Sequence, residues 1–404
     1  MPEGGFEPIG TLVREGRRDG AAAPRVALVH YWLVGMRGGE KVLEQLCAMF
    51  PGADIYTHVA VPERLSERLR AHRIEESFIA RLPFARRHYQ HYLPLMPRAL
   101  EQFDLAAYDL VISSESGPAK GVIPAPETPH LCYCHSPMRY LWDQFHTYRA
   151  GAGRLTRAAM PLIAHSLRQW DVTSAARVDR FAANSTHVAA RIGKYWRREA
   201  DVVHPPVALA DFAPVAPAER GDFYLWAGEL APYKRPDLAI EAFRRLGRPL
   251  VMIGGPEATR RRLAARAPDN VTVLGQVDFA TLRAHLARAR ALVFPGEEDF
   301  GIVPVEAMAS GRPVIAYGRG GALDTVVDGE TGLLYREPTA EGLAEAVLRF
   351  EAEGLDRLDP AALATHAARF SPEAFRIGIA RSLAALGAPL PAPLPAHLRP
   401  PAPA

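Results

Sequence analysis

Short apolar runs alternate with segments of helical periodicity through both halves of this chain. Arg25–Trp32 (RVALVHYW) is the first such run, and a glycine-rich turn separates it from Glu40–Phe50, whose apolar residues have helical spacing. The same rhythm starts again at Phe223–Gly228 and continues to Ala340–Glu351. Buried strands that alternate with helices are typical of parallel sheets covered on both faces. The sequence therefore predicts an α/β fold with two doubly wound sheets.

The length of the chain and a pair of prolines suggest how this pattern is divided. At 404 residues, the chain is long enough for two domains of ordinary size. Pro205 and Pro206 end the first half and mark a boundary at which two halves could hinge. We expect, in order, a disordered leader at 1–24, an N-terminal domain at 25–205, a C-terminal domain at 206–371, a last helix at 372–387 and a Pro-rich tail at 388–404.

Composition excludes several classes of protein. The net charge of +3 is too small to indicate nucleic-acid binding. No apolar run is long enough to span a bilayer, and the N-terminus lacks the apolar core of a secretory signal. The cysteines, Cys47, Cys132 and Cys134, form neither a disulfide framework nor a zinc-site pattern. These features predict a cytoplasmic protein with reduced thiols.

The stretch Phe294–Gly311 (FPGEEDFGIVPVEAMASG) combines groups suited to an anionic, hydroxyl-rich ligand. An apolar run ends in Pro-Gly, carboxylates follow, and a helix is expected from Ile302. Glu298 lies in the loop and Glu306 lies on the helix. Free N–H groups at the start of a helix attract phosphates, and carboxylates accept hydrogen bonds from hydroxyls. A nucleotide sugar carries both kinds of group, so the stretch predicts a site for one.

Another candidate loop, which is basic, follows the first predicted strand of the C-terminal half. It places Lys234 and Arg235 side by side, just before a helix that opens at Pro236. Cations beside a helix N-terminus form a diphosphate site, although adjacent Lys and Arg residues are also common on solvent-facing loops. Since both loops should lie at the carboxyl ends of strands in one sheet, they can face one ligand.

Two features of the N-terminal half are candidates for the opposite wall of the site. Gly38 and Gly39 follow the first strand, where they either let a substrate approach the backbone or only make the turn. His135 ends another predicted strand, and Pro137 prevents further strand pairing beyond it. A histidine at a strand end is a stronger functional candidate than an isolated one.

Other common catalytic patterns are absent from the sequence. It contains no Asp-x-Asp and no spacing of His, Cys and carboxylates typical of a metal site, so we expect no metal ligands. It also lacks the motifs of P-loop NTPases, α/β-hydrolases and dinucleotide-binding folds. Leaving-group charge would then be stabilised by cations and helix dipoles.

Residues 81–100 interleave arginines, histidines, tyrosines and apolar residues. This composition could suit an anionic membrane surface or an amphipathic acceptor. The other interpretation is a helix and loop packed against the sheet edge, and Pro83, Pro94 and Pro97 favour it because they prevent one long amphipathic helix.

Together these blocks resemble glycosyltransferase family 4, the retaining enzymes of the GT-B fold, over residues 25–386. GEEDFGIVPVEAMASGRPVIA is similar to the family's E-G-F-G…E-A-M-A-x-G-x-P-V-I-A block, and GELAPYKRPDLAIEAF is similar to its G-R-L-x-x-x-K block. HYWLVGMRGGEKVLEQL resembles the N-terminal glycine loop. CYCHSPMRYLWD and HPPV are similar to blocks of a bacterial polysaccharide branch, many of whose members transfer mannose from GDP-mannose. The resemblance implies two Rossmann-like domains that face each other across a cleft.

The resemblance also implies roles in the C-terminal domain. Glu298 would contact hydroxyls of the donor sugar as a catalytic residue, and Glu306 would bind the ribose. Lys234, with Arg235, would hold the diphosphate. Further donor-binding positions lie at the start of the helix, where N–H groups would help: Phe300, Gly301, Ile302 and Val303. The chain departs from the family at Glu229, where members often have arginine, so the phosphate site rests on Lys234 alone or with Arg235 as a substitute.

In the N-terminal domain the resemblance assigns His135 a catalytic position facing the donor sugar. Gly38 and Gly39 would lie near the phosphates or the acceptor, and the last helix would cross back onto this domain.

The functional hypothesis is a metal-independent, retaining glycosyltransferase. It would move a hexose, mannose from GDP-mannose in the first instance, onto a glycan or lipid-linked acceptor in polysaccharide biosynthesis. The nucleotide sugar is its substrate, no cofactor is expected, and residues 81–100 are the candidate membrane contact. The alternatives are an epimerase or hydrolase of nucleotide sugars, and a non-catalytic binding subunit that Glu229 would favour.

Overall fold

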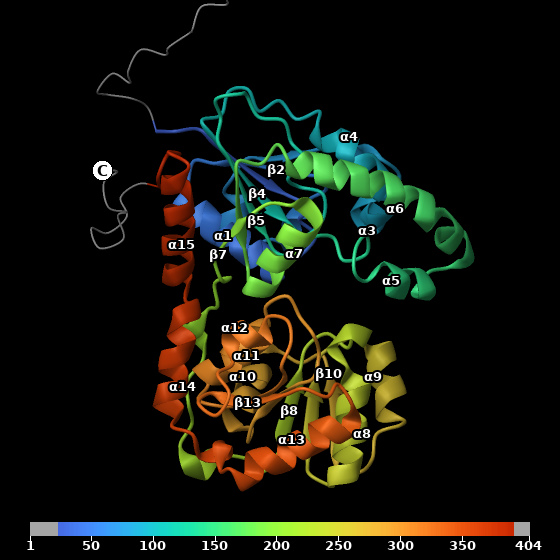
Figure 1. Cartoon of the computed structure of the whole chain (residues 1–404), viewed down its shortest axis with the longest axis vertical. Coiled ribbons are helices and arrows are strands. Elements are labelled where there is room, and N and C mark those ends of the chain that lie inside the picture. Colours follow the sequence, from blue (N-terminus) through green and yellow to red (C-terminus); the bar gives the residue numbers. More distant parts are fainter. Residues whose placement is uncertain (1–22, 392–404) are drawn as a thin grey trace, which may run out of the picture.

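The computed structural model describes residues 23–391, which form two α/β domains stacked along the long axis of the molecule (Figure 1). Each domain has one parallel sheet with helices packed on it. This confirms the predicted fold class of two Rossmann-like, doubly wound domains. The disordered leader and the Pro-rich tail predicted at 1–24 and 388–404 fall almost wholly outside the described residues.

The N-terminal sheet has seven strands in the spatial order β3-β2-β1-β4-β5-β6-β7, all parallel. Its strands are β1 (Val26–His30), β2 (Asp54–Thr57), β3 (Ile74–Glu76), β4 (Leu110–Glu115), β5 (His130–Cys134), β6 (Arg180–Ala183) and β7 (Ala200–Val202). Its helices are α1 (Gly38–Met49), α2 (Glu67–Arg70), α3 (Ala85–His88), α4 (Met96–Leu100), α5 (Phe145–Gly151), α6 (Arg154–Ala175) and α7 (Thr186–Trp196).

The C-terminal sheet has six parallel strands in the order β10-β9-β8-β11-β12-β13. Its strands are β8 (Tyr224–Ala227), β9 (Leu250–Ile253), β10 (Val271–Gly275), β11 (Leu292–Phe294), β12 (Val314–Tyr317) and β13 (Gly332–Tyr335). Its helices are α8 (Pro236–Leu246), α9 (Glu257–Ala264), α10 (Phe279–Arg288), α11 (Ile302–Ala309), α12 (Ala322–Thr325), α13 (Ala340–Ala352) and α14 (Pro360–Ala367).

The strand orders locate the place in each sheet where ligands usually bind. In both sheets the chain runs outward in one direction and then returns past its first strand to build the other half. The reversal lies between β1 and β4 in the first sheet and between β8 and β11 in the second. Open α/β sheets bind ligands at this reversal, outside the carboxyl ends of the strands.

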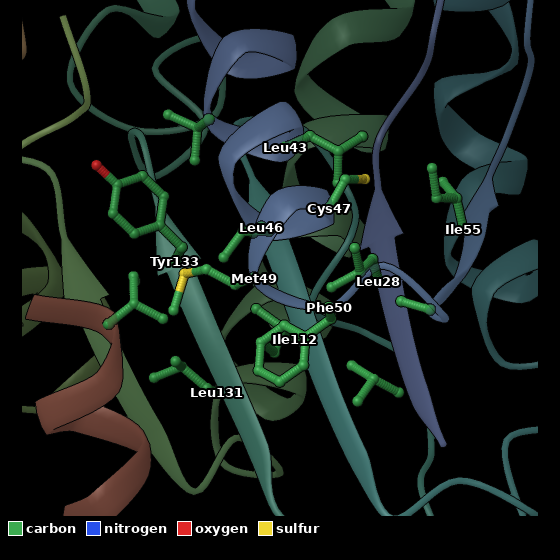
Figure 2. Close-up of a cluster of buried hydrophobic side chains, with 14 of the residues drawn as sticks. Leu28, Leu43, Leu46, Cys47, Met49, Phe50, Ile55, Ile112, Leu131 and Tyr133 are labelled. Carbon is green, nitrogen blue, oxygen red and sulfur yellow. The ribbon is translucent and has the colours of Figure 1, made fainter. Parts of the chain in front are cut away.

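The N-terminal core shows why helical spacing in the sequence predicted α1. Leu43, Leu46 and Met49 come from one face of α1 and point toward sheet residues such as Leu28 and Ile112 (Figure 2). All five side chains are buried. Because residues three and four positions apart share a helix face, the apolar side chains of this segment lie together and cover the sheet.

Some local elements differ from the sequence expectation. Helical spacing at 63–71 predicts one helix, but the structure has a 3-10 turn at Pro62–Arg64 followed by the short α2. The two are separate because Ser66 is extended and its hydroxyl accepts a hydrogen bond from Leu69 N at 3.4 Å, which starts a new helix. Strand β3 was not predicted, because its sequence, IEE, is short and mostly charged.

Residues 81–100 form a series of short helical turns rather than one helix. They include α3, a 3-10 segment at Tyr89–Leu95 and α4, and Pro94 lies inside that 3-10 segment. Ala85, Met96 and Ala99 are buried against the domain, whereas Phe84 is 80% exposed. Among residues 23–391, none of the helices has both the length and the apolar character needed to cross a membrane.

The chain leaves the C-terminal domain along α14 and returns to the N-terminal domain through α15 (Pro372–Ala385) (Figure 1). Phe375, Ile379 and Leu383 of α15 join the buried cluster around α1 and the first sheet. The rings of Phe375 and Tyr133 are 5.3 Å apart in an edge-to-face contact. This helix therefore completes the N-terminal core although it follows the whole C-terminal domain in sequence.

The burial of α15 predicts that its apolar face stabilises the N-terminal domain. Ile379→Ala should lower the free energy of unfolding by about 2–5 kcal/mol, because it opens a cavity in a fully buried site. Urea unfolding followed by circular dichroism measures the change. Arg381→Ala, on the exposed side of the same helix, is the matched control and should be neutral. Equal stability of the two variants would contradict the docked position of α15.

Candidate functional site

Two loops meet at the reversal point of the C-terminal sheet. The loop after β8 carries Lys234, and the loop after β11 carries Glu298. Lys234 Nζ donates to Glu298 Oε1 at 2.6 Å, and the two side chains are 13% and 15% exposed. The loops approach so closely that a Cβ atom on Gly296 would lie 2.7 Å from Lys234 Cα. Glycine at 296 therefore permits the contact that brings the two predicted residues together.

The helix α11 begins directly after these loops and offers free backbone donors. Gly301, its N-cap, has φ of 89°, and no side chain caps the helix start. The N–H groups of the first turn, including those of Ile302 and Val303, are without helical acceptors and carry the positive end of the helix dipole. Phe300 is 3% exposed and stacks on His204 with a centroid separation of 5.5 Å, so it anchors the loop rather than facing the site.

Glu306 lies on α11 and is 8% exposed. Burial raises the pKa of its carboxyl group, an effect that Lys41 opposes and Asp211 reinforces. Lys41 belongs to α1 of the N-terminal domain, so the carboxylate lies near a cation from across the cleft. A buried carboxylate in this position can accept hydrogen bonds from paired hydroxyls such as those of a ribose.

A cavity of about 740 Å³ opens beside the start of α11. The ends of β8, β9 and β10 form its floor, with Gly228, Gly254 and Gln276 among the lining residues, and Val303 lies at its α11 side. A volume of this size suits a nucleotide, since ligand pockets of about 300–1,000 Å³ hold molecules of that class. The cavity therefore lies beside the free N-terminus of the helix that also carries Glu306.

The N-terminal domain supplies the facing wall. A Cβ atom on Gly38 would lie 3.2 Å from Ile302 Cδ1, so this glycine contacts the first residue of α11 across the cleft. Gly39 instead packs inward, where a Cβ would lie 2.3 Å from the Tyr31 hydroxyl. These contacts add to the two roles expected for the glycine pair: Gly38 permits a close interdomain approach, and Gly39 permits close packing within its own domain.

His135 follows β5 and is partly buried at the cleft. Its Nε2 is 2.8 Å from Ser114 Oγ at the end of β4, and its ring contacts Tyr133 at 5.0 Å. Burial lowers the pKa of His135 to about 4, and the nearby Asp299 opposes that shift. The imidazole is therefore neutral near pH 7, where it can hydrogen-bond a hydroxyl but does not act as a fixed cation.

Arg235 lies apart from the cavity. It starts α8 in the left-handed conformation with φ of 54°, and its Nε is 3.5 Å from Asp237 Oδ1. Its side chain is 39% exposed and does not line the 740 Å³ cavity. Of the two adjacent cations, Lys234 is thus the one turned toward Glu298.

Asp299 joins the two domains through arginines that sequence reasoning missed. Its Oδ2 accepts from Arg139 Nε at 3.0 Å, and its Oδ1 accepts from the Arg191 guanidinium at 3.0 Å. Arg139 follows His135 in the turn after β5, and Arg191 comes from α7. The HSPMR block contains Arg139, but the sequence gives no sign that its partner lies 160 positions away.

A second interdomain contact reinforces the first. Asp324 of α12 accepts hydrogen bonds from the backbone N–H and the hydroxyl of Thr186, at the start of α7, the former at 2.7 Å. A carboxylate at a helix N-terminus is stabilised by the helix dipole. Asp299 and Asp324 therefore hold α7 against the segments that follow β11 and β12 in the C-terminal domain.

Comparison with known families gives the two domains their identity. Residues 36–211 match the model described as Glycosyltransferase Family 4, and residues 210–366 match the model described as Glycosyl transferases group 1. The chain carries two glycosyltransferase domains. The matches meet at 210–211, in the segment that joins the two sheets.

Curated relatives bear a related name. The chain is 34% identical over 195 residues to the D-inositol 3-phosphate glycosyltransferase of Mycobacteroides abscessus, a match that covers 42% of this chain and 43% of the relative. It is 35% identical over 194 residues to the enzyme of the same name from Mycolicibacterium paratuberculosis, covering 42% and 44%. The chain thus spans less than half the length of the relatives it matches, and their name does not specify mannose.

Solved structures share the fold of these two domains. Anabaena HepE, in complex with UDP and glucose, aligns with a TM-score of 0.64 at 17% identity, covering 90% of this chain and 100% of HepE. Sucrose-phosphate synthase from Thermosynechococcus elongatus aligns with a TM-score of 0.68 at 20% identity, covering 90% and 99%. At these identities the likeness establishes the GT-B arrangement of two Rossmann-like domains.

The contacts of Asp299 predict that this residue sets the domain orientation. Asp299→Ala should weaken interdomain contact by about 2–5 kcal/mol, because it leaves two arginines without their shared carboxylate. Small-angle X-ray scattering should then report a larger radius of gyration. Asp269→Ala changes an exposed aspartate of the same domain and should leave the scattering curve unaltered. Identical curves for both variants would show that Asp299 does not hold the domains.

Buried histidines of the N-terminal domain predict loss of stability in acid. Burial lowers the pKa of His58 to about 4 and that of His130 to about 3, below the value of about 6.5 in an unfolded chain. As the pH falls below about 6.5, these two histidines bind protons in the unfolded state but stay neutral in the folded state. Each histidine should then cost about 1.4 kcal/mol of stability per pH unit.

Urea midpoints measured between about pH 7 and pH 5 test this effect. His130→Asn should give a shallower pH dependence than the unaltered chain, whatever its stability at neutral pH. His146→Asn, which removes an exposed histidine, should not change the slope. A slope that His130→Asn leaves intact would mean that His130 is protonated in the folded state.

Proposed function

We propose that this chain is a retaining, metal-independent glycosyltransferase that uses a nucleotide-sugar donor. The observation that carries the proposal is the Lys234–Glu298 ion pair of 2.6 Å at the sheet reversal, beside a nucleotide-sized cavity and the free N-terminus of α11. This arrangement puts a cation, oriented N–H groups and a hydroxyl-binding carboxylate within reach of one ligand. The two glycosyltransferase domain matches support the same reading.

The proposed reaction breaks the bond between the anomeric carbon and the diphosphate. The acceptor hydroxyl attacks the anomeric carbon from the face that the diphosphate leaves, so configuration is retained. The acceptor proton passes to the departing phosphate oxygen, and the products are the glycoside and the nucleoside diphosphate. Lys234 and the α11 N–H groups stabilise the charge that develops on the leaving phosphate.

Each remaining site residue then has a task that fits its surroundings. When Lys234 turns to the diphosphate, the Glu298 carboxylate is released to accept hydrogen bonds from donor-sugar hydroxyls. Neutral His135 orients the same sugar from the opposite domain, held by its contact with Ser114. Glu306 accepts the ribose hydroxyls. Bringing groups from two domains onto one sugar lowers the entropic cost of reaching the transition state.

We also propose which donors and acceptors to test first. GDP-mannose is the first donor to test, because of the branch that the N-terminal blocks resemble. UDP-glucose is the second, since Anabaena HepE has been solved in complex with it. The acceptor is a glycan or lipid-linked sugar, and inositol 3-phosphate enters the list because of the name of the curated relatives.

The proposed location is the cytoplasm, with peripheral membrane contact through residues 81–100. The exposed Phe84 and the exposed arginines Arg86 and Arg87 on α3 support this contact, because an apolar ring flanked by cations suits an anionic bilayer surface.

A donor and acceptor screen tests the proposal. The chain is incubated with GDP-mannose, UDP-glucose and ADP-glucose and with each acceptor class, and the anomeric configuration of any product is read by NMR. Glu298→Gln and His135→Ala should each lower the rate by about 10²-fold or more, because each removes a contact to the transferred sugar. Release of free sugar without an acceptor would favour the hydrolase alternative, and binding of a nucleotide without turnover would favour the non-catalytic subunit.

A further inference from the structure

The donor cavity contains an unusual pair of charged side chains. Among the described residues that line it, Arg37 is the only cation and Glu229 the only carboxylate. Glu229 lies on the loop after β8, in the C-terminal domain, where the family resemblance leads one to expect arginine. Arg37 lies in the turn before α1 and is the one lining residue from the N-terminal domain. Compared with the family pattern, the positive charge at this cavity is therefore on the N-terminal wall rather than on the C-terminal wall.

Arg37 stands close to the start of α11. The next residue, Gly38, contacts Ile302 of α11, and Val303 lines the same cavity as Arg37. The backbone of Arg37 is fixed, because its N–H donates to Glu40 Oε2 at 3.0 Å. A phosphate bound at the α11 N-terminus would thus lie beside a guanidinium on an anchored backbone.

The guanidinium of Arg37 is also available. Arg37 is exposed, and within residues 23–391 it forms no ion pair. Lys234 is already bonded to Glu298, and Arg235 pairs with Asp237 outside the cavity. A diphosphate that entered the cavity would therefore meet Arg37 as its one unpaired cation among the described lining residues.

We propose that Arg37 binds the donor diphosphate across the cleft. It would supply the positive charge that an arginine at position 229 provides in the family pattern. This inference rests on the proposed function, because it assumes a nucleoside diphosphate in the cavity. Arginine is well suited to the task, since its planar guanidinium makes two parallel hydrogen bonds to phosphate oxygens. Glu229 has no side-chain partner among the described residues, and its carboxylate would repel the same ligand.

Because the proposed phosphate ligands come from both domains, a bound diphosphate would bridge them and favour the domain orientation of this structure. Loss of the nucleoside diphosphate after reaction removes that bridge. Product release and domain opening are then linked.

A charge-exchange series tests the inference. Isothermal titration calorimetry measures UDP, GDP and ADP binding by the unaltered chain, and the tightest of these is then used as the probe. Arg37→Ala should weaken its binding by about ten- to hundredfold, the range expected for one charge-assisted contact. The matching nucleoside monophosphate should lose less. Arg64→Ala, an exposed arginine of the same domain that lies outside the cavity, is the matched control and should bind as the unaltered chain does.

The double variant gives the sharpest outcome. Glu229→Arg should tighten binding, and Glu229→Arg combined with Arg37→Ala should recover most of the affinity that Arg37→Ala loses, because the cation is returned to the other wall. Arg37→Lys should retain part of the affinity. If Arg37→Ala binds the diphosphate as tightly as Arg64→Ala does, the inference is wrong while the proposed function stands. If the unaltered chain binds none of the three diphosphates, the proposed function itself fails.

Discussion

The two domains of this chain are held together by Asp299, whose carboxylate bonds arginines from the other domain. Its carboxylate accepts hydrogen bonds from Arg139 and Arg191, and it stands next to Glu298, which pairs with Lys234. A single loop thereby fixes both the orientation of the domains and the position of a central candidate residue. This contact helps to hold Gly38 against α11 and Arg37 at the wall of the cavity. Ion pairs with little exposure are strong enough for this task only when several hydrogen bonds share the charge, as they do here.

The region where the chain crosses between domains is built from apolar contacts that lie beside those ion pairs. His204 stacks on Phe300 at 5.5 Å and contacts Phe370 at 5.2 Å, and Val207 N donates to Phe370 O at 2.9 Å. Both crossings of the chain therefore pack on the residue that follows Asp299. The residues that follow Glu298 thus connect the candidate site with the interface between the domains.

Much of this site could be predicted from sequence because its residues lie in local patterns. Lys234 follows a strand and precedes a helix, and Glu298 and Glu306 flank the start of another, so strand-loop-helix logic locates all three. Arg139, Arg191 and Asp324 could not be found in this way. Each lies far from its partner in sequence, and a lone arginine or aspartate on a helix or turn is indistinguishable from a solvated one until the domains are packed. Arg37 was visible beside Gly38, but its proposed role depends on a cavity formed almost wholly by the other half of the chain.

By itself, the sequence determined the class of fold and predicted where a candidate site would lie, because apolar periodicity and glycine positions act over a few residues. Two rounds of strands and helices dictate two parallel sheets, and parallel sheets bring successive loops to one edge. The tertiary structure alone decided which charges meet. It paired Lys234 with Glu298, turned Arg235 toward Asp237, and set Arg37 opposite Glu229 in one cavity. The reason is that electrostatic partners are selected by distance and burial, and both follow from how the domains pack rather than from the order of residues along the chain.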